Sequence, residues 1–188
     1  MSRFLDECIK FIETQPFDIL RISEVQGDGE IETVERRKIG WCQNTYSVAK
    51  TFTMTAIGLL YDRGLLRTDE KIRDIFADEW QEDGVDERWD LVTVDMALTH
   101  KIGVPGGFLD IDTHRSSEFT EDFLRYMLTY PLDYTPGTDR KYSDGAFYLL
   151  ARIAEKKTGE GMDNFLWREL LWPMGFRKWH GATVRWGM

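Results

Sequence analysis

Hydrophobic and polar residues alternate with two different periodicities in the first forty positions of the chain, one helical and one strand-like. Residues 2–14 place their apolar side chains on one helical stripe, made of Phe4, Leu5, Cys8, Ile9 and Ile12, which is typical of an amphipathic helix. Residues 17–25 and 30–39 instead have the β-prone composition and partial alternation of strands. Between them, Gly27-Asp28-Gly29 offers the positive φ that a tight turn needs. The pattern therefore predicts a helix followed by a β-hairpin.

A longer helical pattern begins near residue 44. Asn44 or Thr45 is suited to cap this helix, and Gly64 is suited to end it. We expect its buried stripe to consist of Val48, Phe52, Thr55, Ala56, Leu59 and Leu60. A short helix is expected after Thr68, whereas the acidic residues 78–90 are expected to form a loop.

The second half of the chain is predicted to be helical, with short breaks rich in glycine and proline. The expected helices run from a Thr93 cap to about Thr99, from a Thr120 cap to before Pro131, from about Asp144 to Gly159, and from about Asp163 to Leu171. The third of these should turn Phe147, Leu150, Ala151 and Ala154 inward. A hairpin joined to a helical cluster predicts an α+β fold, and 188 residues argue for a single domain over residues 1–188.

Charge and composition exclude several classes of partner. The formal net charge is -9 and the longest basic run is Arg36-Arg37-Lys38, so we expect no nucleic-acid partner. No apolar run approaches the ~20 residues of a membrane span, and residues 1–13 lack the uncharged apolar core of a secretory signal. We therefore expect a soluble, cytoplasmic chain with no membrane partner. Three His and the separated Cys8 and Cys42 give no metal-ligand spacing or disulfide framework, so no metal is expected.

The tetrad Ser47-Val48-Ala49-Lys50 lies at the start of the longer helix. Side chains three positions apart on a helix lie on the same face, one above the other. A serine hydroxyl becomes a good nucleophile when a neighbouring base takes its proton. The spacing therefore predicts that Ser47 is an activated nucleophile and that Lys50 is its general base or proton relay. For that role, burial would have to lower the pKa of Lys50, and Val48 and Phe52 are apolar neighbours that favour it.

Further motifs follow the tetrad in a fixed order. They are Leu98-Thr99-His100-Lys101-Ile102-Gly103-Val104-Pro105, Pro136-Gly137-Thr138, Tyr142-Ser143-Asp144, and Trp172-Pro173-Met174-Gly175-Phe176. With the hairpin and the tetrad, this order resembles the serine β-lactamase and penicillin-binding-protein superfamily. It most resembles the class C β-lactamase-like branch, which includes esterases and D-amino-acid peptidases. The resemblance runs from about Phe17 to Phe176.

The resemblance implies a serine hydrolase that works through an acyl-enzyme and needs no cofactor. It assigns Tyr142 as the residue that shuttles a proton to the leaving group, opposite Ser47. It also implies a small-molecule or peptide substrate, whether a β-lactam, an ester or a D-amino-acid peptide.

Asp144 departs from the pattern of the family, which usually has an amide there. An ionised carboxylate only accepts hydrogen bonds, whereas an amide also donates them. Asp144 at this substrate-binding position is therefore expected to pair with Lys50 and raise its pKa, or to disfavour substrates that bear a carboxylate. The alternative is that Asp144 only caps the helix that follows.

Three other features are expected to be structural. Lys157-Thr158-Gly159 matches the third box of the superfamily in composition, but its position after Tyr142 indicates a helix end. His100 is expected to be a structural histidine, not a base. His114 and His180 have no convincing acidic or metal partner.

No third box follows Pro173-Met174-Gly175 at the distance that the family would require. The resemblance therefore implies that the C-terminal strands of the sheet, and one of two oxyanion donors, are missing. We consider three alternatives: a fragment of a longer enzyme, a chain completed by a partner or by self-association, and a degenerate relative. A non-catalytic binding or interaction module is the alternative to a serine hydrolase.

Overall fold

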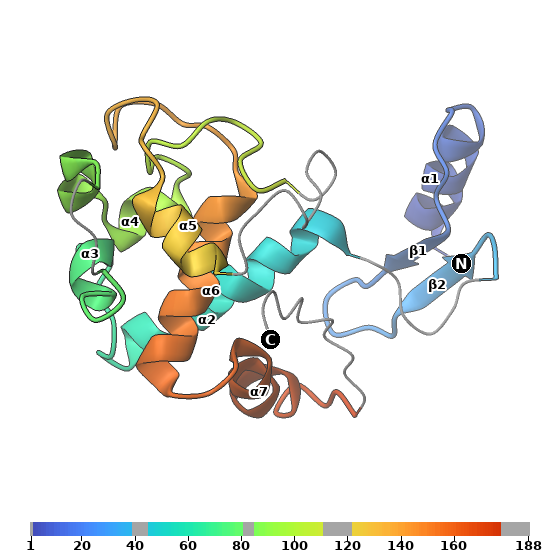
Figure 1. The fold of residues 1–188 in the computed structure, drawn as a ribbon. Coiled ribbons are helices and arrows are strands. Elements are labelled where there is room, and N and C mark those ends of the chain that lie inside the picture. The colour runs from blue at the N-terminus through green and yellow to red at the C-terminus, as the bar shows by residue number, and fades with distance from the viewer. Residues whose placement is uncertain (1, 39–44, 81–84, 111–121, 178–188) are drawn as a thin grey trace. The chain divides into compact units, whose positions relative to one another are not determined.

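A computed structural model describes residues 2–38, 45–80, 85–110 and 122–177 (Figure 1). The chain forms two compact units, Met1–Thr45 and Tyr46–Met188. The single domain that the sequence suggests stays a prediction. Within the described ranges, no helix combines the length and the apolar character needed to cross a bilayer.

The first unit contains one helix and one hairpin. Helix α1 (Arg3–Glu13) begins behind Ser2, whose side chain accepts a hydrogen bond from the Leu5 N–H at 3.0 Å. Strands β1 (Arg21–Glu24) and β2 (Glu32–Glu35) pair antiparallel, with Ile22 opposite Val34. The helix and the hairpin are confirmed, although both strands are shorter than the sequence pattern suggested.

The second unit is helical. Its elements are the 3-10 turn η1 (Tyr46–Val48), α2 (Ala49–Asp62), α3 (Ile72–Ile75), the 3-10 turn η2 (Glu87–Leu91), α4 (Val94–Leu98), α5 (Phe123–Thr129), α6 (Asp144–Thr158), α7 (Met162–Leu166) and the π-helical turn η4 (Trp167–Leu171). The helical cluster and the two-stranded sheet confirm the α+β class for the described residues.

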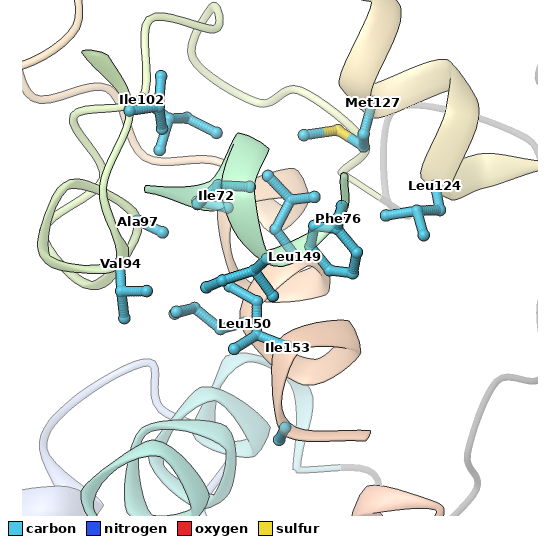
Figure 2. Close-up of a cluster of buried hydrophobic side chains, with 14 of the residues drawn as sticks. Ile72, Phe76, Val94, Ala97, Ile102, Leu124, Met127, Leu149, Leu150 and Ile153 are labelled. Carbon is cyan, nitrogen blue, oxygen red and sulfur yellow. The ribbon is translucent and has the colours of Figure 1, made fainter. Parts of the chain in front are cut away.

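The hydrophobic core of the second unit surrounds α6, which packs against α2, α4, α5 and α7. Figure 2 shows Leu149, Leu150 and Ile153 of α6 among core side chains from α3, α4 and α5. Leu150 and Ala154 are fully buried as predicted, and Leu149 and Ile153 complete the inner face, whereas Phe147 and Ala151 are only partly buried. Phe147 instead faces the segment around His100, at a ring-centroid distance of 5.0 Å.

The expectation of a loop over residues 78–90 is wrong in part. Residues 81–84 lie outside the described ranges, but η2 follows them and buries Trp89 completely. The indole N–H of Trp89 donates to the Tyr130 carbonyl at 2.9 Å. A large aromatic side chain with its polar atom satisfied thus anchors this acidic segment to the core.

The helix caps match the sequence signals only in part. Thr93 caps α4 as predicted, accepting a hydrogen bond from the Met96 N–H at 3.3 Å. Thr120 lies outside the described residues, and Asp122 caps α5, accepting from the Arg125 N–H at 2.9 Å. Gly159 ends α6 in the left-handed conformation, at φ 72°.

Two glycines of the second unit are expected to respond oppositely to alanine. Gly58 lies within α2 and Gly159 ends α6, and a Cβ added at either position meets no atom within 4 Å. Gly58→Ala should stabilise the protein by about 0.5–1 kcal/mol, because alanine favours the helix interior. Gly159→Ala should destabilise it by about 1–2 kcal/mol, because alanine disfavours positive φ. Urea unfolding of both variants measures the two signs, and the same sign for both would contradict the backbone explanation.

Candidate active site

Ser47 lies in η1, immediately before α2, and its side chain is exposed. The preceding residue, Tyr46, has φ 46°, a left-handed conformation that is uncommon for a side chain of this size. Val48 is exposed, so its predicted place in the buried stripe of the helix is wrong. Ala56 and Leu60 are buried as predicted, and Thr53 and Ile57 complete the buried stripe. The start of the helix thus presents the Ser47 hydroxyl to solvent.

Lys50 lies one turn after Ser47, as the tetrad predicts. Its Nζ donates to Ser47 Oγ at 3.4 Å. The ammonium also lies 4.8 Å from the centroid of the Tyr142 ring and 5.9 Å from that of Phe147. These rings and not Val48 surround the lysine head, and the side chain is only 16% exposed.

Tyr142 reaches the same place from a segment 95 positions further along the chain. Its hydroxyl donates to Ser47 Oγ at 2.7 Å, and the residue is 40% exposed. Ser47 Oγ therefore accepts hydrogen bonds from both Lys50 and Tyr142. The structure brings together the three side chains that the sequence and the family resemblance single out.

Asp144 completes the cluster as an ion-pair partner. It is the first residue of α6, and its carboxylate accepts a hydrogen bond from Lys50 Nζ. The cap of α6 is Ser143, whose Oγ accepts from the Ala146 N–H at 3.3 Å. The capping alternative for Asp144 is therefore wrong, and the pairing alternative describes its contact.

The charge of Lys50 follows from two opposing effects. Burial alone lowers its pKa, but the hydrogen bond and charge of Asp144, together with the Tyr142 hydroxyl, outweigh burial and raise the pKa above its ordinary value. The direction is opposite to the one that a simple burial argument gives. Lys50 is thus held as an ammonium in this arrangement.

The start of α6 is fixed to the loop that precedes residue 110. The Phe108 carbonyl accepts the N–H groups of both Asp144 and Gly145 at 3.1 Å, and the Gly107 N–H donates to the Tyr142 carbonyl at 2.8 Å. A Cβ on Gly145 would lie 2.9 Å from atoms of Phe108 and Met127. The close packing that glycine permits here sets the position of Asp144 and, through it, of Lys50.

Other sequence candidates lie apart from this cluster. Lys157 and Gly159 form a helix end, as predicted, and Lys157 Nζ pairs with Glu70 at 2.7 Å. Cys8 is a free thiol, whereas Cys42, His114 and His180 lie outside the described residues. Among the side chains that the structure describes, no group of three His, Cys, Asp or Glu residues is arranged to hold a metal ion.

His100 is the residue whose part in the site sequence reasoning underestimated. It is buried, as expected of a structural histidine, but its ring lies 4.6 Å from that of Tyr142, between centroids. The signal in the sequence was its position in the second motif of the ordered series. Nothing in the residue type of His100 indicated that its ring would pack against the ring of Tyr142.

Solved structures of known proteins superpose on the fold described above. The structure of a penicillin-binding protein from Bacillus halodurans superposes with a TM-score of 0.60 at 20% identity, over 84% of this chain and 52% of that one. A class C β-lactamase superposes with a TM-score of 0.54 at 25% identity, over 69% of this chain and 33% of that one. The chain therefore has the fold seen in penicillin-binding proteins and class C β-lactamases.

The sequence comparison gives the family. The beta-lactamase family model matches residues 43–183, and the chain belongs to that family. It is also 31% identical to penicillin-binding protein 4 of Amycolatopsis lactamdurans, over 70% of this chain and 34% of that protein. The chain therefore spans about a third of the length of this curated relative.

Proposed function

We propose that the chain is a serine hydrolase that forms an acyl-enzyme on Ser47. The observation that carries the proposal is the convergence of the Lys50 amine and the Tyr142 hydroxyl on one exposed serine oxygen, at 3.4 and 2.7 Å. Nucleophilic catalysis by serine requires a base within hydrogen-bond reach and a donor for the leaving group. Membership of the beta-lactamase family supports the same chemistry.

In the proposed reaction, Ser47 Oγ bonds to the carbonyl carbon and its proton passes to the neutral amine of Lys50. The Ser47 N–H, in the 3-10 turn that precedes α2, stabilises the oxyanion. As the bond to the leaving group breaks, Tyr142 gives that group its hydroxyl proton and regains one from the Lys50 ammonium. Water then hydrolyses the ester on Ser47 by the reverse proton path, and the site returns to its starting state.

The ion pair with Asp144 sets the pH dependence of this mechanism. Because the pKa of Lys50 is raised, only a small fraction of the amine is neutral at pH 7. The rate of acylation should therefore rise with pH through the alkaline range. Asp144 also contributes a negative charge beside the nucleophile, which disfavours substrates whose own carboxylate would lie there.

Esters and strained amides are the proposed substrates, with β-lactams and D-amino-acid peptides as members of the second class. The relatives named as penicillin-binding proteins and β-lactamases support this range. An uncharged ester is the favoured first substrate, because it avoids repulsion from Asp144.

The Lys50–Asp144 pair also favours a second candidate, a binding module without turnover. A lysine held as an ammonium is a poor base, so these side chains would bind a ligand and leave it intact. Binding that survives Ser47→Ala, combined with background hydrolysis of activated esters by the wild-type chain, would support this candidate.

Covalent labelling tests the proposed hydrolase. The 188-residue chain, incubated with a fluorescent penicillin or a fluorophosphonate at pH 7 and pH 9, should acquire one adduct, located on Ser47 by peptide mass mapping. Labelling should be faster at pH 9, and Ser47→Ala should abolish it. A folded wild-type chain that gains no adduct on Ser47 at either pH would refute the proposal.

A further inference from the structure

His100 contacts the backbone on both sides of Tyr142. Its carbonyl accepts the N–H of Lys141 at 2.9 Å, and its Nδ1 accepts the N–H of Ser143 at 3.3 Å. Its ring also contacts the phenol ring between these two residues, at 4.6 Å between centroids and 34° between planes. His100 thus contacts Lys141 before Tyr142, Ser143 after it, and the ring of Tyr142 itself.

The backbone of His100 makes this double contact geometrically feasible. Its φ is 58°, a left-handed conformation in which non-glycine residues are uncommon and in which Asn, Asp and His are enriched. The His100 N–H is bonded to the Ala97 carbonyl at 3.2 Å, at the end of α4. The residue is therefore tied to α4 on one side and to the segment before α6 on the other.

We infer that His100 is a positioning residue, which holds Tyr142 in place for proton transfer at Ser47 through two backbone hydrogen bonds and a ring contact. To accept the Ser143 N–H, Nδ1 must be unprotonated, so the proton of the neutral ring is on Nε2. The consequence for rate rests on the proposed function. The hold on the backbone is a property of the fold and does not rest on it.

The surroundings of His100 favour the accepting form. Burial lowers the pKa of His100, and the positive charges of Arg140 and Lys50 lower it further, against the opposing charge of Asp144. The rings of Tyr142 and Phe147 pack against its own ring, at 4.6 and 5.0 Å between centroids. In acid, protonation of Nδ1 removes the acceptor and adds a third cation to this cluster, so the hold on Ser143 is lost.

Two substitutions separate the contributions of the ring and the acceptor. His100→Asn keeps an acceptor near the position of Nδ1 and tolerates a left-handed backbone, but it has no titratable group. His100→Phe keeps an aromatic ring but removes the acceptor. Amide hydrogen exchange followed by NMR reports the Ser143 hydrogen bond, the Tyr142 ring shifts report its placement, and the labelling rate of Ser47 reports the chemistry.

The wild type should protect the Ser143 amide at pH 7 and lose this protection in a transition below about pH 6.5. His100→Asn should retain protection without that transition, and its labelling rate should remain within about threefold of the wild type. His100→Phe should lose roughly tenfold in Ser143 protection, shift the Tyr142 ring resonances and slow labelling by tenfold or more. Protection of the Leu149 amide in α6 verifies that the fold is intact.

The assignment is overturned if His100→Phe matches the wild type in Ser143 exchange and in the Tyr142 ring shifts. If that variant does not fold, persistence of the acid transition in His100→Asn overturns it equally. A wild-type chain that never labels on Ser47 defeats the proposed hydrolase, while the exchange and ring measurements still decide the positioning role.

Discussion

Tyr142→Phe is expected to slow covalent modification of Ser47 by about 10²- to 10⁴-fold without unfolding the protein. The substitution removes only the hydroxyl that donates to Ser47 Oγ at 2.7 Å. It keeps the ring that packs against His100 and lies near the Lys50 ammonium. Because Tyr142 is partly exposed, loss of one hydroxyl should change the free energy of unfolding by about 1 kcal/mol or less. Rates are measured with the fluorescent penicillin, whose departing nitrogen must take a proton, under pseudo-first-order conditions.

Tyr61→Phe is the matched control for this substitution. Tyr61 is exposed near the other end of α2, and its backbone lies about 20 Å along the helix axis from that of Ser47. The control should label at the wild-type rate. Equal labelling of Tyr142→Phe and the wild type would show that the phenol does not transfer the proton and would leave the Lys50 amine as the only relay.

The parts of the site that sequence reasoning predicts well are local. The i, i+3 spacing of Ser47 and Lys50 decides their proximity through helix geometry alone, and the structure agrees. Tyr142, 95 positions away, could be placed beside them only through the resemblance to a family. Periodicity and capping rules carry no information about which distant segment faces a helix.

What the sequence does not reveal depends on competition between neighbours. Burial by itself predicts a lowered pKa for Lys50, yet the contact with Asp144 reverses the direction. Phe147 of α6 is only partly buried and packs toward His100, and no pattern within that helix predicts this contact. Trp89 lies in an acidic stretch whose composition predicts a loop, although its side chain is fully buried in the core. Each of these outcomes is fixed by residues from other elements.

Lys50→Met is expected to slow labelling of Ser47 by about 10³-fold, because it removes the proton acceptor and the cation beside Tyr142. It also leaves the Asp144 carboxylate, 27% exposed, without its ammonium. The free energy of unfolding should fall by about 1–3 kcal/mol, less than for a fully buried pair because solvent reaches both groups. Lys157→Met is the matched control, since it breaks the similarly exposed pair with Glu70 and should lower stability without slowing labelling.

Asp144→Asn separates the two consequences of losing Lys50. Added to Lys50→Met, it removes the uncompensated carboxylate and should recover most of the lost stability but none of the lost rate.

Alone, Asp144→Asn should bring the raised pKa of Lys50 down, so the alkaline rise in labelling moves to lower pH and the rate at pH 7 increases several-fold. The stability that the raised pKa supplies is fully present below the ordinary lysine pKa of about 10.4 and is lost as pH rises through the higher folded value. Asp144→Asn should therefore unfold with less dependence on alkaline pH. An unchanged pH profile of labelling in this variant would show that the ion pair does not control the base.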